Sequence, residues 1–347
     1  MRTLRRALGL VLAMVGVVAL LTVPALAGSP IVIKLGHGDT ADNNYGGVHN
    51  GAMAFKQLVE SRTAGRVQVE IFPNNQLGSP REMFESTKMG SMQMLWEGIG
   101  AFTGFVPEFM VFSMPYTFPN ITVALKVLDG DFGDELSALS VKKTGVRLLA
   151  YSQYGWRHFT NNKRAIRTPA DMKGLKIRTQ EDPAMMKLVQ SMDASATPIA
   201  WGELYTALQQ GVVDGEENPT SMIQVAKLYE VQKYMTMDGH ILAVNPVCIN
   251  EKFYQSLPQD IRHIIRDSAH TAALVYNGVN TYGATLDVAD LAKKGMQIYV
   301  PTEAEHQQFV KAAQGPVKDF VVSKIGKEWP DKLLKAIATA QTAHLKD

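Results

Sequence analysis

Short stretches of the chain alternate hydrophobic with polar residues, and the stretches between them repeat hydrophobic residues three or four positions apart. Residues 31–35 and 67–71 show the alternation, which is the period of a β-strand, and residues 46–63 show the helical spacing. A second helix is expected from Ser79, which can cap it, and residues 92–96 are expected to form a buried strand. The opening third is therefore predicted to be β-α-β-α-β.

The same alternation continues along the rest of the chain. Strands that alternate with helices predict an α/β fold with mostly parallel sheets covered on both faces. No glycine- or serine-rich linker divides the sequence, so two domains are expected to be joined by several crossing segments that act as hinges. Further strands are expected at 146–151, 175–178, 231–237 and 241–249, with helices at 123–139, from Asp182 and Pro183, at 258–291, and in C-terminal segments broken near Gly295, Gly326 and Pro330.

The N-terminus has the pattern of a secretory signal. Three arginines lie around the start of an almost wholly apolar run at 7–23, and residues 24–27 end in the small-x-small pattern that signal peptidase cleaves. We expect cleavage after Ala27; the alternative is an uncleaved membrane anchor, since the run approaches the length of a spanning helix. Removal takes three arginines and no acids, so the formal charge changes from +2 to −1, and a nucleic-acid partner is not expected.

Motifs for enzyme chemistry are missing from the sequence. Cys248 is the one cysteine, which excludes an intramolecular disulfide, and it is interpreted as a buried hydrophobic residue. Residues 98–104 contain glycines but are one residue too long for a dinucleotide-binding fingerprint. The eight histidines show no zinc-binding spacing, and there is no nucleophile elbow. An enzyme, a cofactor and a metal site are therefore not expected.

Arg178 is the first candidate for ligand binding. It ends a predicted strand and is followed by the helix start at Asp182, and ligands of open α/β sheets bind beyond the carboxyl ends of strands. A guanidinium beside a helix N-terminus suits a carboxylate, because its planar fork can hold both oxygens. The alternative is a structural ion pair with an acid such as Glu181, and local sequence favours neither.

Four further residues are candidates for the same site. Arg157 lies in an aromatic-rich stretch just after a predicted strand, although a stacked or surface arginine is the alternative. Glu97 follows a strand and is either a solvated acid or an acceptor for a ligand hydroxyl or amine. Asn218 precedes a proline, so it either caps a helix or presents its amide to a ligand. Trp201 is either a core residue or part of a pocket wall.

Several motifs, in one order along the mature chain, resemble those of the solute-binding proteins of tripartite ATP-independent periplasmic (TRAP) transporters. This family includes proteins that bind dicarboxylates. Because the motifs are separate and keep their order, the resemblance is more specific than any one of them. They lie at 55–65, 72–78, 170–178, 201–219, 229–234, His240 and 257–258.

The resemblance implies a two-lobed periplasmic binding protein fold, with lobes joined by crossing hinge segments and a long helix. The expected lobes are residues 28–153 with 244–284, and 154–243 with 285–347. By resemblance, Arg178 clamps the solute carboxylate, and Arg157, Asn218 and Glu97 also contact the solute.

Three residues complete the implied site. Trp201 and Tyr205 are expected to line the pocket. The family's usual Gln-Glu-Asn-Pro is Glu216-Glu217-Asn218-Pro219 here, which adds a carboxylate; Glu217 is included among the ligand-binding residues, and a cation beside the solute stays open.

The implied function is capture of a small organic acid by closure of the cleft, followed by delivery to the membrane permease of a TRAP transporter. A ligand-binding module for a periplasmic sensory receptor is the alternative, and a periplasmic enzyme acting on an organic acid is a weaker one. The two arginines favour a carboxylate, while Glu97 suits a hydroxylated or amino-bearing acid. Dicarboxylates and aromatic acids stay open.

Overall fold

The computed structural model describes residues 29–41 and 47–344, so the predicted signal segment lies outside the described residues. Within them, one nine-stranded sheet has the order β2-β1-β3-β8-β4-β7-β5-β6, and β9 pairs with β8. The strands are β1 (Ile31–Gly36), β2 (Val67–Phe72), β3 (Met94–Trp96), β4 (Val146–Asn161), β5 (Lys176–Thr179), β6 (Ser195–Pro198), β7 (Gly215–Pro219), β8 (Tyr234–Asn250) and β9 (Gln297–Tyr299).

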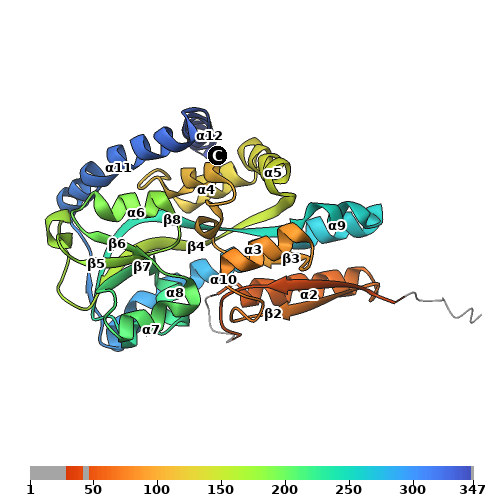
Figure 1. Ribbon diagram of the computed structural model, residues 1–347, viewed down its shortest axis with the longest axis horizontal. Helices are drawn as coiled ribbons and strands as arrows, with labels where there is room; N and C mark the ends of the chain where they lie inside the picture. The colour runs from red at the N-terminus through yellow and green to blue at the C-terminus, as the bar shows by residue number, and fades with distance from the viewer. Residues whose placement is uncertain (1–28, 42–46, 345–347) are drawn as a thin grey trace, which may run out of the picture.

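Helices cover both faces of this sheet (Figure 1). Short 3-10 helices occupy Ile99–Phe102, Pro107–Ser113, Pro169–Met172, Trp201–Glu203 and Leu228–Glu230. The α-helices are α2 (His49–Arg62), α3 (Pro80–Met89), α4 (Ile121–Leu128), α5 (Asp131–Thr144), α6 (Pro183–Gln190), α7 (Leu204–Gln209), α8 (Thr220–Val225), α9 (Glu251–Ser256), α10 (Gln259–Lys293), α11 (Glu303–Ile325) and α12 (Glu328–His344).

Two groups of parallel strands lie on either side of a long antiparallel pair. β1 is parallel to β2 and β3, and β5 is parallel to β6 and β7. Between the groups, β4 and β8 run antiparallel over almost their whole length. The expected parallel strands are therefore confirmed within each group, whereas the expectation of mostly parallel sheets is wrong for the connection, which is antiparallel and makes the whole sheet continuous.

The long strands differ from the sequence prediction because bulges allow the strands to include residues that are typical of turns. The predicted strand at 146–151 continues to Asn161, and the segments at 231–237 and 241–249 belong to the single strand β8. Register shifts accompany the change of direction near Gly155 and near Gly239, which both have positive φ. The predicted helix at 123–139 is instead two helices, separated at Asp129 and Gly130.

One bulge lies where the two parallel groups meet. Gln153 pairs with Val244 while Gly155 pairs with Ala243, so the ladder slips by one residue. Side chains of α10 hydrogen-bond the backbone exposed by the slip: the Gln153 amide donates to Asn277 Oδ1 (3.0 Å), and Asn280 Nδ2 donates to the Gln153 carbonyl (3.2 Å). Because buried backbone groups need partners, α10 stabilises this irregular crossing.

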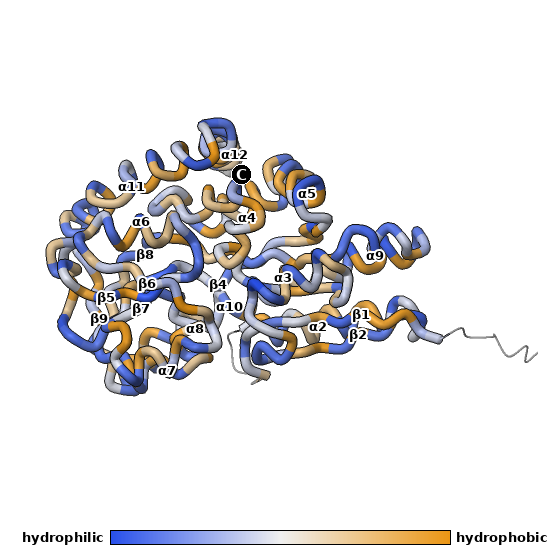
Figure 2. The backbone as a smooth tube through the Cα atoms, in the orientation of Figure 1, coloured by the Kyte–Doolittle hydropathy of each residue, from blue (hydrophilic) through white to orange (hydrophobic). Residues whose placement is uncertain are grey.

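Three hydrophobic cores fix the helices on the sheet. One joins β1, β2 and α2 to the first half of α10, and a small one lies under α7 and α8. The largest runs beneath α4, α5, α6 and α11, where α12 packs through an edge contact of Trp329 with Phe132. Hydrophilic and hydrophobic residues alternate along α5, as expected for a helix with one buried face (Figure 2).

Candidate functional site

The predicted residues converge on small cavities between the two groups of parallel strands. A central cavity of about 30 Å³ is lined by Glu97, Arg157, Asn218 and Trp201, together with residues from α3, β4 and α8. An inner cavity of about 20 Å³ shares Arg157 with it. Space of this size holds one or two water molecules, so an organic acid can enter only when the two sides move apart.

Arg178 lies on β5, is almost fully buried, and does not itself line the described cavities. Its Nε donates to the carbonyl oxygen of Ile199 (2.8 Å), while its Nη1 is buried and has no hydrogen-bond partner in the described part of the chain. Among the described residues no acid forms an ion pair with it, so the alternative pairing with Glu181 does not occur. Burial, partly offset by Glu217, lowers the pKa of Arg178 to about 10, so the group stays a cation at neutral pH.

Arg157 extends from β4 to Glu217 on the neighbouring β7. Its Nε and Nη2 both donate to the Glu217 carboxylate, the second at 2.9 Å. Burial opposes ionisation of Glu217, but Arg157 and His240 outweigh it and lower the pKa of that carboxyl. Glu217 is fully buried behind Arg157 and does not line the described cavities. Its contacts hold Arg157 in place and leave the arginine's other face at the cavity.

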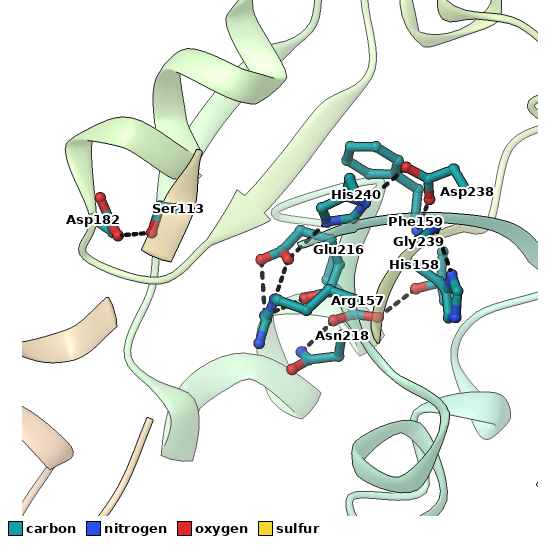
Figure 3. A network of polar contacts seen from close by, with 12 residues as sticks. Ser113, Arg157, His158, Phe159, Asp182, Glu216, Asn218, Asp238, Gly239 and His240 are labelled. Atoms are coloured by element: carbon teal, nitrogen blue, oxygen red, sulfur yellow. Dashed lines mark hydrogen bonds and ion pairs between the residues drawn. The ribbon is translucent and has the colours of Figure 1, made fainter. Parts of the chain in front are cut away.

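His240 and Asp238 of β8 continue this network away from the cavity (Figure 3). His240 Nε2 lies 3.2 Å from Glu217 Oε2, and its Nδ1 lies 2.8 Å from Asp238 Oδ2. Burial lowers the pKa of His240, yet Asp238 and Glu217 raise it overall to about 9. The imidazolium therefore bridges two carboxylates and fixes the position of Glu217 from behind.

Asn218 lines the central cavity from β7 rather than capping a helix, because Pro219 takes the cap position of α8. Its Nδ2 donates to Glu216, whose other carboxylate oxygen accepts from Thr160 (2.6 Å). Burial raises the pKa of Glu216 to about 7. The carboxylates of Glu216 and Glu217 both have protein partners, and the described residues contain no cluster of ligands that could hold a metal ion.

Two buried acids lie on the other side of the cavity. Glu97 directly follows β3, as predicted, and accepts from the amides of Gly38 and Gly98. Asp39 accepts from the Val48 amide (2.6 Å) and from the Tyr154 hydroxyl (3.2 Å). Burial, and then the charge of Asp39, raises the pKa of Glu97 to about 8, and burial raises that of Asp39 to about 6. The site thus has arginines on one side and weakly acidic carboxyls on the other.

Trp201 separates the central cavity from an outer cavity of about 170 Å³, and its side chain contributes to both. Tyr205 lines the outer cavity, where its hydroxyl donates to Glu230 (2.7 Å). The structure therefore brings Glu97, Arg157, Asn218 and Trp201 together, and places Tyr205 one cavity further out.

Sequence reasoning missed three residues that line the central cavity with polar side chains. Asp39 follows β1, Gln180 follows β5, and Tyr154 lies within β4. The first two follow the carboxyl ends of parallel strands, which is the signal that identified Glu97. Tyr154 gave no such signal, because the strand was expected to end before it.

A continuous sheet with two parallel-stranded groups, and buried arginines between them, defines the class of two-lobed solute-binding proteins. The sequence matches the family described as bacterial extracellular solute-binding protein, family 7 (DctP), over residues 39–324. It is 36% identical over 288 residues to a solute-binding protein of Verminephrobacter eiseniae, covering 83% of this chain and 84% of that protein.

Two further relatives cover more of the chain. The C4-dicarboxylate-binding periplasmic protein DctP of Rhodobacter capsulatus is 34% identical over 329 residues, which are 93% of this chain and 96% of that one. The sugar acid binding protein of Advenella mimigardefordensis, solved with galactonate, superposes with a TM-score of 0.85 at 28% identity, covering 90% of this chain and 99% of that chain.

The chain therefore belongs to family 7 of the bacterial extracellular solute-binding proteins, the solute-binding proteins of TRAP transporters. This family consists of periplasmic substrate-binding proteins that take up small organic acids and work with membrane permease subunits. Within residues 29–41 and 47–344, no helix has the length and hydrophobicity needed to cross a membrane.

Proposed function

We propose that this protein captures a hydroxylated monocarboxylic acid between its lobes and delivers it to the permease of a TRAP transporter. The observation that carries the proposal is the buried Nη1 of Arg178, which has no partner among the described residues and lies on the strand whose following residue Gln180 lines the central cavity with Arg157. A buried cation without a full set of partners is costly in the free protein. A solute carboxylate supplies the missing acceptor when the lobes close.

The acids opposite the arginines favour hydroxyl groups over a second carboxylate. Glu97 and Asp39 both line the cavity, and burial raises the pKa of Glu97 to about 8 and that of Asp39 to about 6, so at neutral pH Glu97 retains its proton and Asp39 is mostly ionised. A second solute carboxylate would meet like charge or compete for the same few donors, whereas a hydroxyl can both donate and accept. The galactonate in the structurally similar Advenella protein has this chemistry, whereas C4-dicarboxylates, named for the Rhodobacter relative, do not.

Isothermal titration with galactonate and succinate tests the proposal. Galactonate should bind at least tenfold more tightly than succinate. Arg178→Ala should weaken galactonate binding about 10- to 100-fold, because a charged hydrogen bond contributes about 1.5–3 kcal/mol. Arg178→Lys should also weaken it, since lysine lacks the planar fork.

Arg66→Ala serves as the matched control, because Arg66 forms an exposed ion pair with Asp260 and neither residue lines the described cavities. It should bind galactonate like the wild type. Unchanged affinity in both arginine-178 variants would contradict the carboxylate clamp. NMR of galactonate recovered after prolonged incubation should show an unaltered solute, because we propose binding without turnover.

The proposal includes export and a closing motion. Signal cleavage after Ala27 would release the mature chain into the periplasm, and mass spectrometry of the exported protein checks the new N-terminus. We place the lobes at 28–153 with 244–284 and at 154–243 with 285–347. The bulge that pairs Gln153 with Val244 and Gly155 with Ala243 supports crossing points at these positions. α12 packs on α4 and α5, so it extends from the second lobe over the first.

A further inference from the structure

We infer that the outer cavity beyond Trp201 binds the far end of the solute, so that the physiological solute is longer than a four-carbon acid. This inference rests on the proposed function and specifies the solute further. At about 170 Å³ the outer cavity is several times larger than the central and inner cavities. Most of the enclosed space near the arginine site therefore lies in the outer cavity.

The outer cavity adjoins the central one. Asp39 and Trp201 line both, so these two side chains form the partition between them. Trp201 is only partly buried, and it lies in a short 3-10 helix, Trp201–Glu203, without a buried residue. A solute held by its carboxylate at the arginines extends past Glu97 toward this partition. Movement of the tryptophan ring joins the two spaces.

Both sides of the cleft contribute to the outer cavity, and they differ in chemistry. Gly38, Thr40, Asn74 and Asn75 supply polar groups from the segments that follow β1 and β2. The facing segments supply mainly hydrophobic side chains, which are Leu204, Val225, Ala226 and Leu228. The cavity therefore matches a solute end that has hydroxyl groups on one side and carbon atoms on the other.

Two polar atoms of this lining lack a partner. Thr40 Oγ1 and Asn75 Oδ1 are buried and form no hydrogen bond within the described residues. Burying such groups without partners costs free energy, and native proteins usually satisfy them. Hydroxyl groups of a bound solute satisfy both atoms, since a hydroxyl donates to the asparagine oxygen and either donates to or accepts from the threonine. The geometry thus points to a polyhydroxylated acid of about six carbons.

Thr40→Val gives a test with little risk to folding, because valine keeps the shape and the lost hydroxyl has no hydrogen-bond partner within the described residues. The probes are galactonate, with six carbons, and erythronate, with four. Thr40→Val should weaken galactonate binding about 3- to 10-fold, the value of one hydrogen bond, and leave erythronate binding unchanged. Thr285→Val, on the exposed face of α10, is the matched control and should change neither.

Ala226→Leu fills the cavity from the hydrophobic side and tests the inference independently. It should weaken galactonate binding tenfold or more while erythronate binds as before. Ala289→Leu, at an exposed position of α10, controls for the added side chain. Circular dichroism melts should show that Ala226→Leu is folded, and retained erythronate binding confirms an intact arginine site.

The outcomes separate this inference from the proposed function. If both acids bind the wild type and Arg178→Ala weakens both, but neither cavity variant distinguishes them, the outer cavity is only solvent space and the inference is overturned. Equal losses for both acids in Thr40→Val and Ala226→Leu overturn it too. If neither acid binds the wild type, the proposed function itself fails.

Discussion

Glu97 is a fully buried carboxyl whose pKa is raised to about 8 by burial and then by Asp39. Between about pH 5 and 8 the folded protein holds a proton on this group that the unfolded chain has released. The free energy of unfolding should therefore fall as pH rises through this window, by up to about 1.4 kcal/mol per unit. Glu97→Gln should lack this contribution. Urea denaturation at several pH values should therefore show that the stability of the variant increases relative to the wild type as pH rises.

Glu85→Gln, on the exposed side of α3, is the control and should keep the wild-type slope. If the free energy of unfolding depends on pH in the same way in the wild type and in Glu97→Gln, folding is not coupled to protonation of this carboxyl. The raised pKa of His240, about 9, also makes stability fall as pH rises above the ordinary pKa of histidine. Because His240 is present in both proteins, the difference between them reports on Glu97.

For single residues, the sequence predicted which side chains lie at the site better than it predicted the role of each. Arg157, Glu97, Asn218 and Trp201 line the central cavity, and their contact with a solute stays a prediction. The sequence could not show that Glu217 pairs with Arg157. Glu216 and Glu217 are adjacent, and the pairing of β4 with β7 decides which of the two carboxylates contacts the guanidinium. Alternate residues of a strand point to opposite faces, so one position of register decides the role.

The crossing of β4 and β8 depends on one helix. Asn277→Ala would leave the Gln153 amide buried and without its partner on α10. The free energy of unfolding should fall by about 1–3 kcal/mol, the cost of an unsatisfied buried donor, and urea denaturation measures it. Thr285→Ala, on the exposed face of the same helix, should change stability by less than about 0.5 kcal/mol. Equal effects of the two substitutions would show that the bulge needs no support.

Helices and parallel strands were predictable because their patterns are local. Ser79 and Asp182 cap α3 and α6 as the sequence indicates, and α10 spans nearly the predicted range. The long strands were not predictable, because Gly155 and the Asp238-Gly239 pair have turn chemistry. Only pairing between β4 and β8, distant in sequence, keeps these residues extended as bulges.

In the proposed closing motion, Gly38 of one lobe comes close to Trp201 of the other. A Cβ added there would lie 2.8 Å from Glu97 Oε1, 2.9 Å from Asn75 Oδ1 and 3.0 Å from Trp201 Cδ1. Gly38→Ala should therefore hinder the approach of Trp201 and weaken galactonate binding about tenfold. Small-angle X-ray scattering should show a smaller decrease in radius of gyration on adding galactonate than in the wild type.

Gly278→Ala on α10 is the control, because a Cβ there meets no atom within 4 Å. It should compact like the wild type when galactonate is added. A Gly38→Ala variant that compacts fully and binds normally would show that the tight contact yields without cost, and that another contact limits closure.

The unbroken β4–β8 ladder has a consequence for how such proteins diversify. Each of these strands is shared by the two halves of the molecule, so a fragment carrying one half would present long rows of bare amides and carbonyls and would aggregate. Because the two halves share these strands, recombination between relatives cannot exchange one half as an independent unit. New solute preferences must instead arise by point changes in the loops around the crevice, with the scaffold inherited whole.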